Sequence, residues 1–225
     1  LHDAIMFKNT SMANTSLRKL KNYLLKKHAQ YADHVITVSE TVKKKIKQYW
    51  NILPEKISVI YPAIDSVWFE TIESKKCEQI LAKYCINRPF FLAVGTLQPR
   101  KNFLRIIEAF EIVNQQYPDK ITLVIVGKVG WQCEEIIHKI EALKDKMDIK
   151  WLKYIDHQAL RCLYQSSLAL VFPSLAEGFG YPIIEALASK TQVITSNYGS
   201  MHELGRDHAY LVDPTKTEEI LDTML

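Results

Sequence analysis

A turn predicted between a strand and a helix carries two carboxylates eight positions apart, Glu177 and Glu185. The apolar run 168–172 predicts a buried strand, and Pro182 suits the first turn of a helix. The Gly-Phe-Gly segment 178–180 is therefore predicted to be the strand-to-helix turn. Backbone N–H groups at a helix start can face a phosphate or a sugar hydroxyl, and glycine lets a ligand approach the main chain. This is the layout of a ligand site.

The two carboxylates narrow the kind of ligand. Carboxylate oxygens accept hydrogen bonds, so Glu177 and Glu185 suit the hydroxyls of a sugar or a ribose and would repel a phosphate. The alternative interpretation is a helix-capping loop with one acidic residue outside the helix and another on its surface. Taken alone, the segment favours neither interpretation.

A second predicted turn places two cations after a short strand. The apolar segment 89–94 predicts a strand that ends at Gly95, and Arg100 and Lys101 follow at the start of the helical pattern 102–116. Two cations at a helix start oppose the helix dipole. A bound diphosphate would offset that cost, because it pairs with the fork of a guanidinium and the point charge of an ammonium. The alternative is a solvated basic turn.

Three blocks of the sequence together resemble the family 4 retaining glycosyltransferases, which have the GT-B fold. The blocks are residues 94–102 (VGTLQPRKN), 177–185 (EGFGYPIIE) and 196–203 (SNYGSMHE). Their order within one α/β domain also fits this family. The resemblance implies a Rossmann-like parallel sheet with helices on both faces, and a nucleoside-diphosphate sugar as the donor substrate.

The resemblance also implies a role for each matching residue. The cation pair would hold the donor diphosphate, the first Glu and the glycine turn would face the donor sugar, and the second Glu would hold the ribose hydroxyls. A guanine or uracil base would lie against residues 153–155. The residues expected to act in catalysis are Arg100, Lys101, Glu177 and His2, and those expected to bind the donor are Gly95, Thr96, Tyr154, Ile155, Gly178, Phe179, Gly180 and Glu185.

His2 is included because a His-Asp pair in related enzymes lies at the domain cleft, where the His reaches the donor sugar. Here His2 and Asp3 are next to the chain end, and a frayed terminus is the alternative interpretation. The chain is therefore expected to be the carboxyl-terminal part of a larger protein, and to bind the donor better than it transfers the sugar. The amino-terminal domain is expected to be incomplete.

The chemistry expected is transfer of a hexose, with mannose favoured, to a glycan or lipid-linked acceptor with retention of configuration. The leaving nucleoside diphosphate gains negative charge, which preorganised cations such as Arg100 and Lys101 would stabilise. No Asp-x-Asp motif occurs, so we expect no metal and no cofactor; GDP-mannose is the first choice of substrate and a UDP-hexose the second. A noncatalytic sugar-nucleotide-binding module is the alternative. A nicotinamide dehydrogenase is disfavoured because the G-x-G-x-x-G motif is missing after the strand that ends at Gly95.

Strand and helix patterns alternate from residue 89 onward, which predicts a parallel sheet covered on both faces. Strand patterns also occur at 35–39 and 56–60, after a helical segment at 15–33. We divide the chain into an acceptor-side remnant (1–65), a linker with an entry helix (66–88) and a donor-binding domain (89–225). The predicted strands are 90–94, 121–126, 149–154, 168–172 and 192–195, and the predicted helices of the donor domain are 102–116, 132–146, 157–166, 182–189 and 200–204.

Composition indicates a globular enzyme of 225 residues with a net charge of +4, and we expect a cytoplasmic location. No apolar run approaches the ~20 residues that cross a bilayer. The basic segment 17–28 and the lysines at 43–47 indicate either a solvated helix or attachment to an anionic membrane surface. Nucleic-acid motifs are missing. Four scattered cysteines without CxxC pairs predict free thiols rather than a disulfide framework or zinc site.

Overall fold

A computed structural model describes residues 16–117 and 121–225, with side chains from Leu20 onward. Contacts between Cα atoms divide the chain into two units. The smaller unit comprises Leu1–Ala63 and Ala176–Gly180, and the larger comprises Ile64–Leu175 and Tyr181–Leu225. The expected acceptor-side and donor-side roles of the two parts stay predictions.

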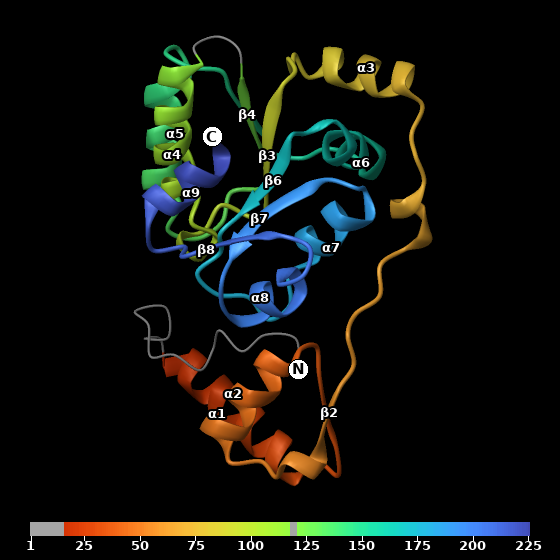
Figure 1. The fold of residues 1–225 in the computed structure, drawn as a ribbon. Coiled ribbons are helices and arrows are strands. Elements are labelled where there is room, and N and C mark those ends of the chain that lie inside the picture. Colours follow the sequence, from red (N-terminus) through yellow and green to blue (C-terminus); the bar gives the residue numbers. More distant parts are fainter. Residues whose placement is uncertain (1–15, 118–120) are drawn as a thin grey trace. The chain divides into compact units, whose positions relative to one another are not determined.

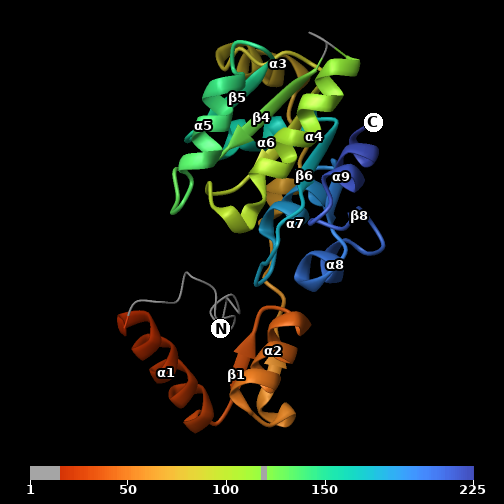
Figure 2. The same cartoon turned by 90° about the vertical axis from the view of Figure 1, so that its left-hand side faces the viewer.

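The larger unit is built on a parallel sheet of six strands in the order β5-β4-β3-β6-β7-β8 (Figure 1; β5 is labelled in Figure 2). Helices alternate with the strands along the chain, so the predicted α/β fold class is confirmed. The strands are β3 (Phe90–Val94), β4 (Thr122–Val126), β5 (Ile149–Leu152), β6 (Ala169–Phe172), β7 (Gln192–Ser196) and β8 (Tyr210–Val212).

Both faces of this sheet are buried, which explains why its central strands are apolar at nearly every position. In β3, Phe91 and Ala93 point into the core beneath α4, α5 and α9, whereas Phe90 and Leu92 point into the core beneath α6 and α7. The helices of this unit are α3 (Ser74–Lys83), α4 (Phe103–Gln116), α5 (Glu134–Leu143), α6 (His157–Ser166), α7 (Tyr181–Ala188), α8 (Gly199–Gly205) and α9 (Thr217–Met224).

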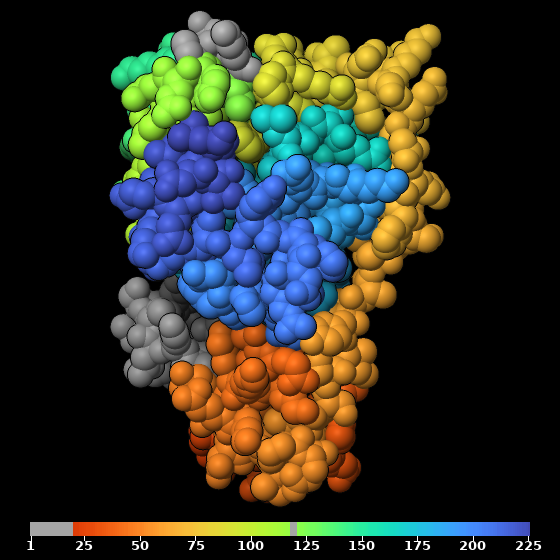
Figure 3. Space-filling view, in the orientation of Figure 1, coloured from red at the N-terminus to blue at the C-terminus, as the bar shows by residue number. Residues whose placement is uncertain are grey.

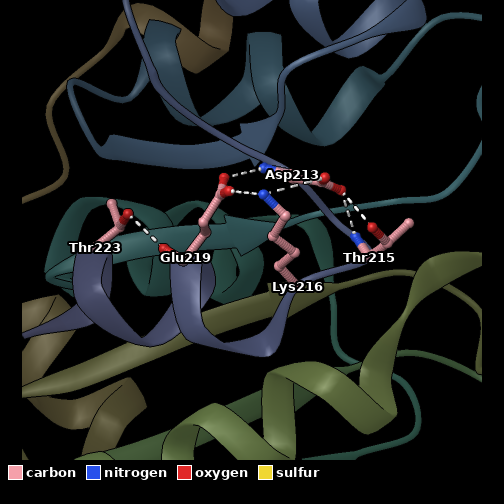
Figure 4. Close-up of polar contacts among 5 residues, drawn as sticks. All are labelled: Asp213, Thr215, Lys216, Glu219 and Thr223. Carbon is pink, nitrogen blue, oxygen red and sulfur yellow. Dashed lines mark hydrogen bonds and ion pairs between the residues drawn. The ribbon is translucent and has the colours of Figure 1, made fainter.

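Helix α9 packs against α4, and the two adjoin on the face of the molecule in Figure 3. Ile220 and Met224 of α9 are buried in the core. A polar network fixes the turn that leads into this helix (Figure 4). Glu219 accepts a hydrogen bond from the backbone N–H of Asp213 at 2.7 Å and forms an ion pair with Lys216 at 2.8 Å. These contacts connect the residue after β8 to the first turn of α9.

The smaller unit contains a two-stranded parallel sheet and two longer helices (Figure 2). Ser39 caps α2 by accepting a hydrogen bond from the N–H of Val42 at 3.1 Å, and Ile46 is buried on the same helix. On α1, Leu20 is 53% exposed. No helix in the described ranges combines the length and apolar content needed to cross a membrane. The elements are α1 (Ser16–Tyr31), β1 (Val35–Thr37), α2 (Glu40–Trp50) and β2 (Ile57–Val59), with short 3₁₀ turns at Pro54–Lys56 (η3) and, in the larger unit, Ser66–Phe69 (η4).

Candidate functional site

The sheet of the larger unit reverses its strand order at β3, which lies between β4 and β6. Phe91 is in register with Leu123 on one side and with Ala169 on the other. In open parallel sheets, ligands bind beyond the carboxyl ends of the strands at such a switch point. A ligand site is therefore expected at the loops that follow β3 and β6. Two of the three sequence blocks, 94–102 and 177–185, follow these strands.

Gly95, the first residue after β3, has a φ of +149°, a backbone conformation that residues with a side chain rarely adopt. A Cβ atom at this position would lie 3.2 Å from Cε of Lys101. The main chain is also crowded from the side of β4, because a Cβ atom on Gly127 would lie 1.8 Å from the carbonyl oxygen of Gly95. Glycine at both positions lets the ends of β3 and β4 meet and leaves room for the Lys101 side chain.

Arg100 and Lys101 lie in a 3₁₀ turn, η5 (Pro99–Lys101), directly before the helix that the sequence predicted from residue 102. Helix α4 begins at Phe103, one residue after the predicted start, so the two cations directly precede its positive end. Lys101 Nζ lies 4.6 Å from the centroid of the Phe172 ring at the end of β6, and the carbonyl of Arg100 accepts a hydrogen bond from the N–H of Leu175 at 2.8 Å. The side chain of Lys101 and the main chain of Arg100 thus contact the end of β6 and the loop after it, whereas the Arg100 guanidinium donates to Gln98 Oε1 at 3.1 Å.

Asn102 fixes this cationic turn, a role that sequence reasoning missed. The residue has a left-handed backbone (φ 64°, ψ 28°) and is 3% exposed. Its Nδ2 donates to the carbonyl oxygens of Pro173 at 3.0 Å and Pro214 at 2.7 Å, and its Oδ1 accepts from Arg105 at 3.0 Å. One side chain therefore joins the loops after β3, β6 and β8. The available signal was an Asn directly before an apolar helical pattern, since Asn tolerates left-handed geometry.

Glu185 lies on α7, the helix that follows β6, and is half-buried. Its Oε2 accepts a hydrogen bond from the hydroxyl of Tyr164 on α6 at 2.9 Å. Burial raises the pKa of Glu185, while the Tyr164 hydrogen bond and the charge of His157 act in the opposite direction. Burial also raises the pKa of Tyr164 well above its usual range, so the phenol remains a neutral donor.

The turn with the first carboxylate groups with the smaller unit by its contacts. Glu177 is 9% exposed, and the carbonyl of Gly178 accepts a hydrogen bond from Ser39 Oγ at 2.7 Å. The Phe179 ring lies 6.4 Å from the ring of Tyr61, centroid to centroid. The structure thus shows what holds this turn in the smaller unit, and the sugar-facing roles of Glu177 and residues 178–180 stay predictions.

The remaining predicted site residues are dispersed. Tyr154, after β5, is 75% exposed, whereas the side chain of Ile155 is buried in the core and leaves only its main chain for a ligand. Thr96 follows Gly95 in the loop after β3. His2 lies outside the described residues. In the third sequence block, Tyr198 donates to the carbonyl of Leu175 at 2.9 Å, which ties that block to the loop after β6.

Comparison with known proteins assigns these features to a family. The family described as "Glycosyl transferases group 1" matches residues 79–225, and "Glycosyltransferase Family 4" matches residues 1–67. The chain is 37% identical over 195 residues to the O-antigen chain mannosyltransferase RfbU of Salmonella typhimurium, covering 85% of this chain and 50% of that protein. It is 27% identical over 187 residues to the O-antigen chain mannosyltransferase B of Escherichia coli, covering 83% of this chain and 49% of that protein.

The fold is similar to that of Anabaena Alr3699/HepE, solved in complex with UDP and glucose, with a TM-score of 0.81 and 22% identity. That likeness covers 100% of this chain and 59% of the Anabaena chain. The chain spans about half the length of the two mannosyltransferases named above. Since the group 1 family matches most of the chain, and the fold is that of GT-B enzymes, this chain belongs to the glycosyl transferases group 1.

Proposed function

We propose that this chain binds a nucleoside-diphosphate hexose and transfers the hexose to a glycan or lipid-linked acceptor, with retention of configuration and without a metal. One observation carries the proposal: the cationic turn after β3 is anchored to the end of β6, at the switch point of the sheet. Arg100 and Lys101 offer the charge that a diphosphate needs, and Glu185, on the helix after β6, offers an acceptor for ribose hydroxyls.

The proposed chemistry follows from the leaving group. As the glycosidic bond to the diphosphate breaks, negative charge grows on the β-phosphate and positive charge on the anomeric carbon. Arg100 and Lys101 are positioned before the reaction starts, because Asn102 and Phe172 hold the turn. Preorganised charge of this kind stabilises a transition state without the cost of reorganising solvent. We assign Glu177 to orientation of the donor sugar and His2 to contact with it, and we name no covalent nucleophile.

Mannose is the proposed sugar, with GDP-mannose as the donor. The names of the two relatives that are most informative here, both O-antigen chain mannosyltransferases, support mannose and a polysaccharide acceptor. A UDP-hexose is the second donor, supported by the UDP and glucose of the Anabaena complex. The base would contact the loop at Tyr154 and Ile155, where the buried Ile155 side chain leaves main-chain atoms for recognition.

The proposed place of action is the cytoplasmic face of an anionic membrane, where lipid-linked acceptors reside. Lysines on α2, among them Lys43, Lys44 and Lys47, give this helix the charge that such a surface attracts. Binding of the chain to vesicles with and without an anionic lipid tests this part. Equal binding to both kinds of vesicle, or binding to neither, would contradict attachment to an anionic membrane. Neither outcome would bear on the proposed donor site.

Calorimetric titration of GDP and UDP, with and without EDTA, tests the donor site. We expect at least one nucleotide to bind equally well in EDTA, because the proposed phosphate ligands are protein cations. Loss of binding on chelation would contradict the metal-free account. Binding of neither nucleotide by a folded chain would contradict the proposed function. Turnover of GDP-mannose is measured separately, and turnover would exclude a noncatalytic sugar-nucleotide-binding module.

A matched pair of variants tests the two carboxylates. Glu185→Ala should weaken the binding of the free nucleotide by about 1.5–3 kcal/mol, the value of a hydrogen bond to a charged group. Glu177→Ala should leave the affinity for the free nucleotide nearly unchanged and weaken only the binding of the nucleotide sugar, because the proposed contact of Glu177 is to the sugar. The reverse pattern would show that the donor is placed backwards between the two residues.

A further inference from the structure

A hydroxyl is buried at the centre of the larger unit although a phenyl ring would fill the same space. Tyr164 is fully buried and is among the largest fully buried side chains of the chain. A buried hydroxyl destabilises a protein unless it makes a hydrogen bond. The hydroxyl of Tyr164 donates to Glu185 Oε2 at 2.9 Å. Its partner is therefore a carboxylate that the proposed function places against the ribose.

The ring of Tyr164 is packed in the core beneath α6 and α7. The indole of Trp68, in η4, meets it edge to face with centroids 5.5 Å apart, and the same indole contacts His157 at 4.7 Å. The backbone carbonyl of Tyr164 accepts a hydrogen bond from Thr191 Oγ1 at 2.6 Å. A side chain packed in this way stays in one rotamer, so its hydroxyl can hold a partner in one place.

The hydrogen bond leaves Glu185 able to bind a ligand. A carboxylate has two oxygens and about four acceptor sites, and a single donor occupies one of them. Tyr164 is a neutral donor, because its ionisation is suppressed by burial beside Glu185. It fixes the carboxylate without the competition that a lysine or arginine partner would bring. The arrangement suits an acceptor for a pair of adjacent hydroxyls.

We infer that Tyr164 is a positioning residue for the nucleotide: its hydroxyl holds Glu185 in the orientation that accepts the ribose hydroxyls, and it contributes to affinity without touching the ligand. The inference rests on the proposed function, in which Glu185 binds ribose. The competing account is that Tyr164 only fills the core. The two accounts differ in one measurable respect, because only positioning depends on the hydroxyls of the ribose.

The test is the affinity of Tyr164→Phe for GDP and for 2′,3′-dideoxy-GDP, the same nucleotide without the two ribose hydroxyls. We expect the substitution to weaken the binding of GDP about threefold to tenfold, which is the value of roughly one hydrogen bond. The affinity for dideoxy-GDP should change by less than about twofold. In a Glu185→Ala background, Tyr164→Phe should have no further effect on GDP. If UDP proves to be the nucleotide that binds, the same pair of uridine nucleotides is used.

Thr191→Val is the matched control. This substitution removes the hydrogen bond to the Tyr164 carbonyl and leaves the Tyr164 hydroxyl in place. It should therefore lower the stability of the fold without changing the ratio of the affinities for GDP and dideoxy-GDP. Equal weakening of GDP and dideoxy-GDP by Tyr164→Phe would overturn the inference in favour of a structural role. If Glu185→Ala weakens GDP and Tyr164→Phe does not, the inference fails and the proposed function stands. If the folded wild-type chain binds neither GDP nor UDP, both fail.

Discussion

The main chain of Gly95 lies directly against the side chain of Lys101, with only 3.2 Å between Lys101 Cε and the position of a Cβ atom on Gly95. The Lys101 ammonium also lies over the ring of Phe172, 4.6 Å from its centroid. The side chain of Lys101, which we propose binds the phosphate, therefore extends between the ends of β3 and β6. It can do so only because residue 95 is a glycine. This relationship links a backbone requirement to the charge of the site.

Gly95→Ala should weaken nucleotide binding more than it destabilises the fold. The new methyl group would push the Lys101 side chain away, and the φ of +149° would add backbone strain of about 1–3 kcal/mol. Gly205→Ala is a matched control: its Cβ would also be crowded, at 3.0 Å from Thr195, but by residues outside the cationic turn. Urea unfolding and GDP titration of both variants check this. Equal loss of affinity in the two variants would contradict the proposed path of Lys101.

Asn102 should prove to be the main structural support of the cationic turn. Asn102→Ala removes the two hydrogen bonds to buried carbonyls and places a side chain in left-handed geometry, for an expected loss of about 2–4 kcal/mol. Asn102→Gly removes the same hydrogen bonds but fits the backbone, so it should be about 1 kcal/mol more stable than the alanine variant. Urea unfolding measures both. A loss below 0.5 kcal/mol in both variants, roughly the size of an ordinary surface change, would show that the amide contacts contribute little.

The sequence predicted the elements whose pattern is local. Strand β3 and helix α6 have the predicted bounds, because an apolar run and an amphipathic period with a capping Asp156 are complete within their own residues. Helix α5 ends at Leu143, three residues before the predicted end. Helix α2 was predicted only as one interpretation of its lysines and without bounds, because those lysines interrupt the apolar pattern of Val42, Ile46 and Trp50.

What the sequence could not show depends on distant partners. Strand β8 was missed because its three residues, of which Tyr210 is exposed, form a strand only by pairing with β7. The contact of Asn102 with Pro214 spans 112 positions. The hydrogen bond between Tyr164 and Glu185 joins two helices, and neither helix pattern predicts it. Motifs therefore located the candidate residues, and the fold was needed to find what holds them.

The stability of the chain should depend on pH through Glu185. Burial raises its pKa above the usual 4.5, so the folded chain binds this proton more tightly than the unfolded chain does. The stabilising effect is complete below the unfolded pKa and is lost as the pH rises through the folded pKa. Glu185→Gln removes this loss, so its stability relative to wild type should increase from pH 4.5 upward.

Urea unfolding across this pH range measures the difference. In Tyr164→Phe the window should extend to higher pH, because the hydrogen bond that lowers the folded-state pKa of Glu185 is gone. Parallel pH profiles for wild type and Glu185→Gln would contradict a raised pKa. A window that moves to lower pH in Tyr164→Phe would contradict the direction of the hydrogen bond's effect.

The four free cysteines should differ sharply in reactivity. Cys85 is exposed, whereas burial, with a contribution from neighbouring Cys77, raises the pKa of Cys162 to about 12. The thiolate is the reactive form, so Cys162 should stay unmodified in the native chain at pH 8. A short maleimide pulse followed by peptide mass spectrometry should find Cys85 labelled first, with Cys77, Cys133 and Cys162 labelled only after unfolding. Cys85→Ser, as the control, should take up almost no label while folded; labelling of Cys162 at the rate of Cys85 would show that the core beside α3 and α6 opens readily.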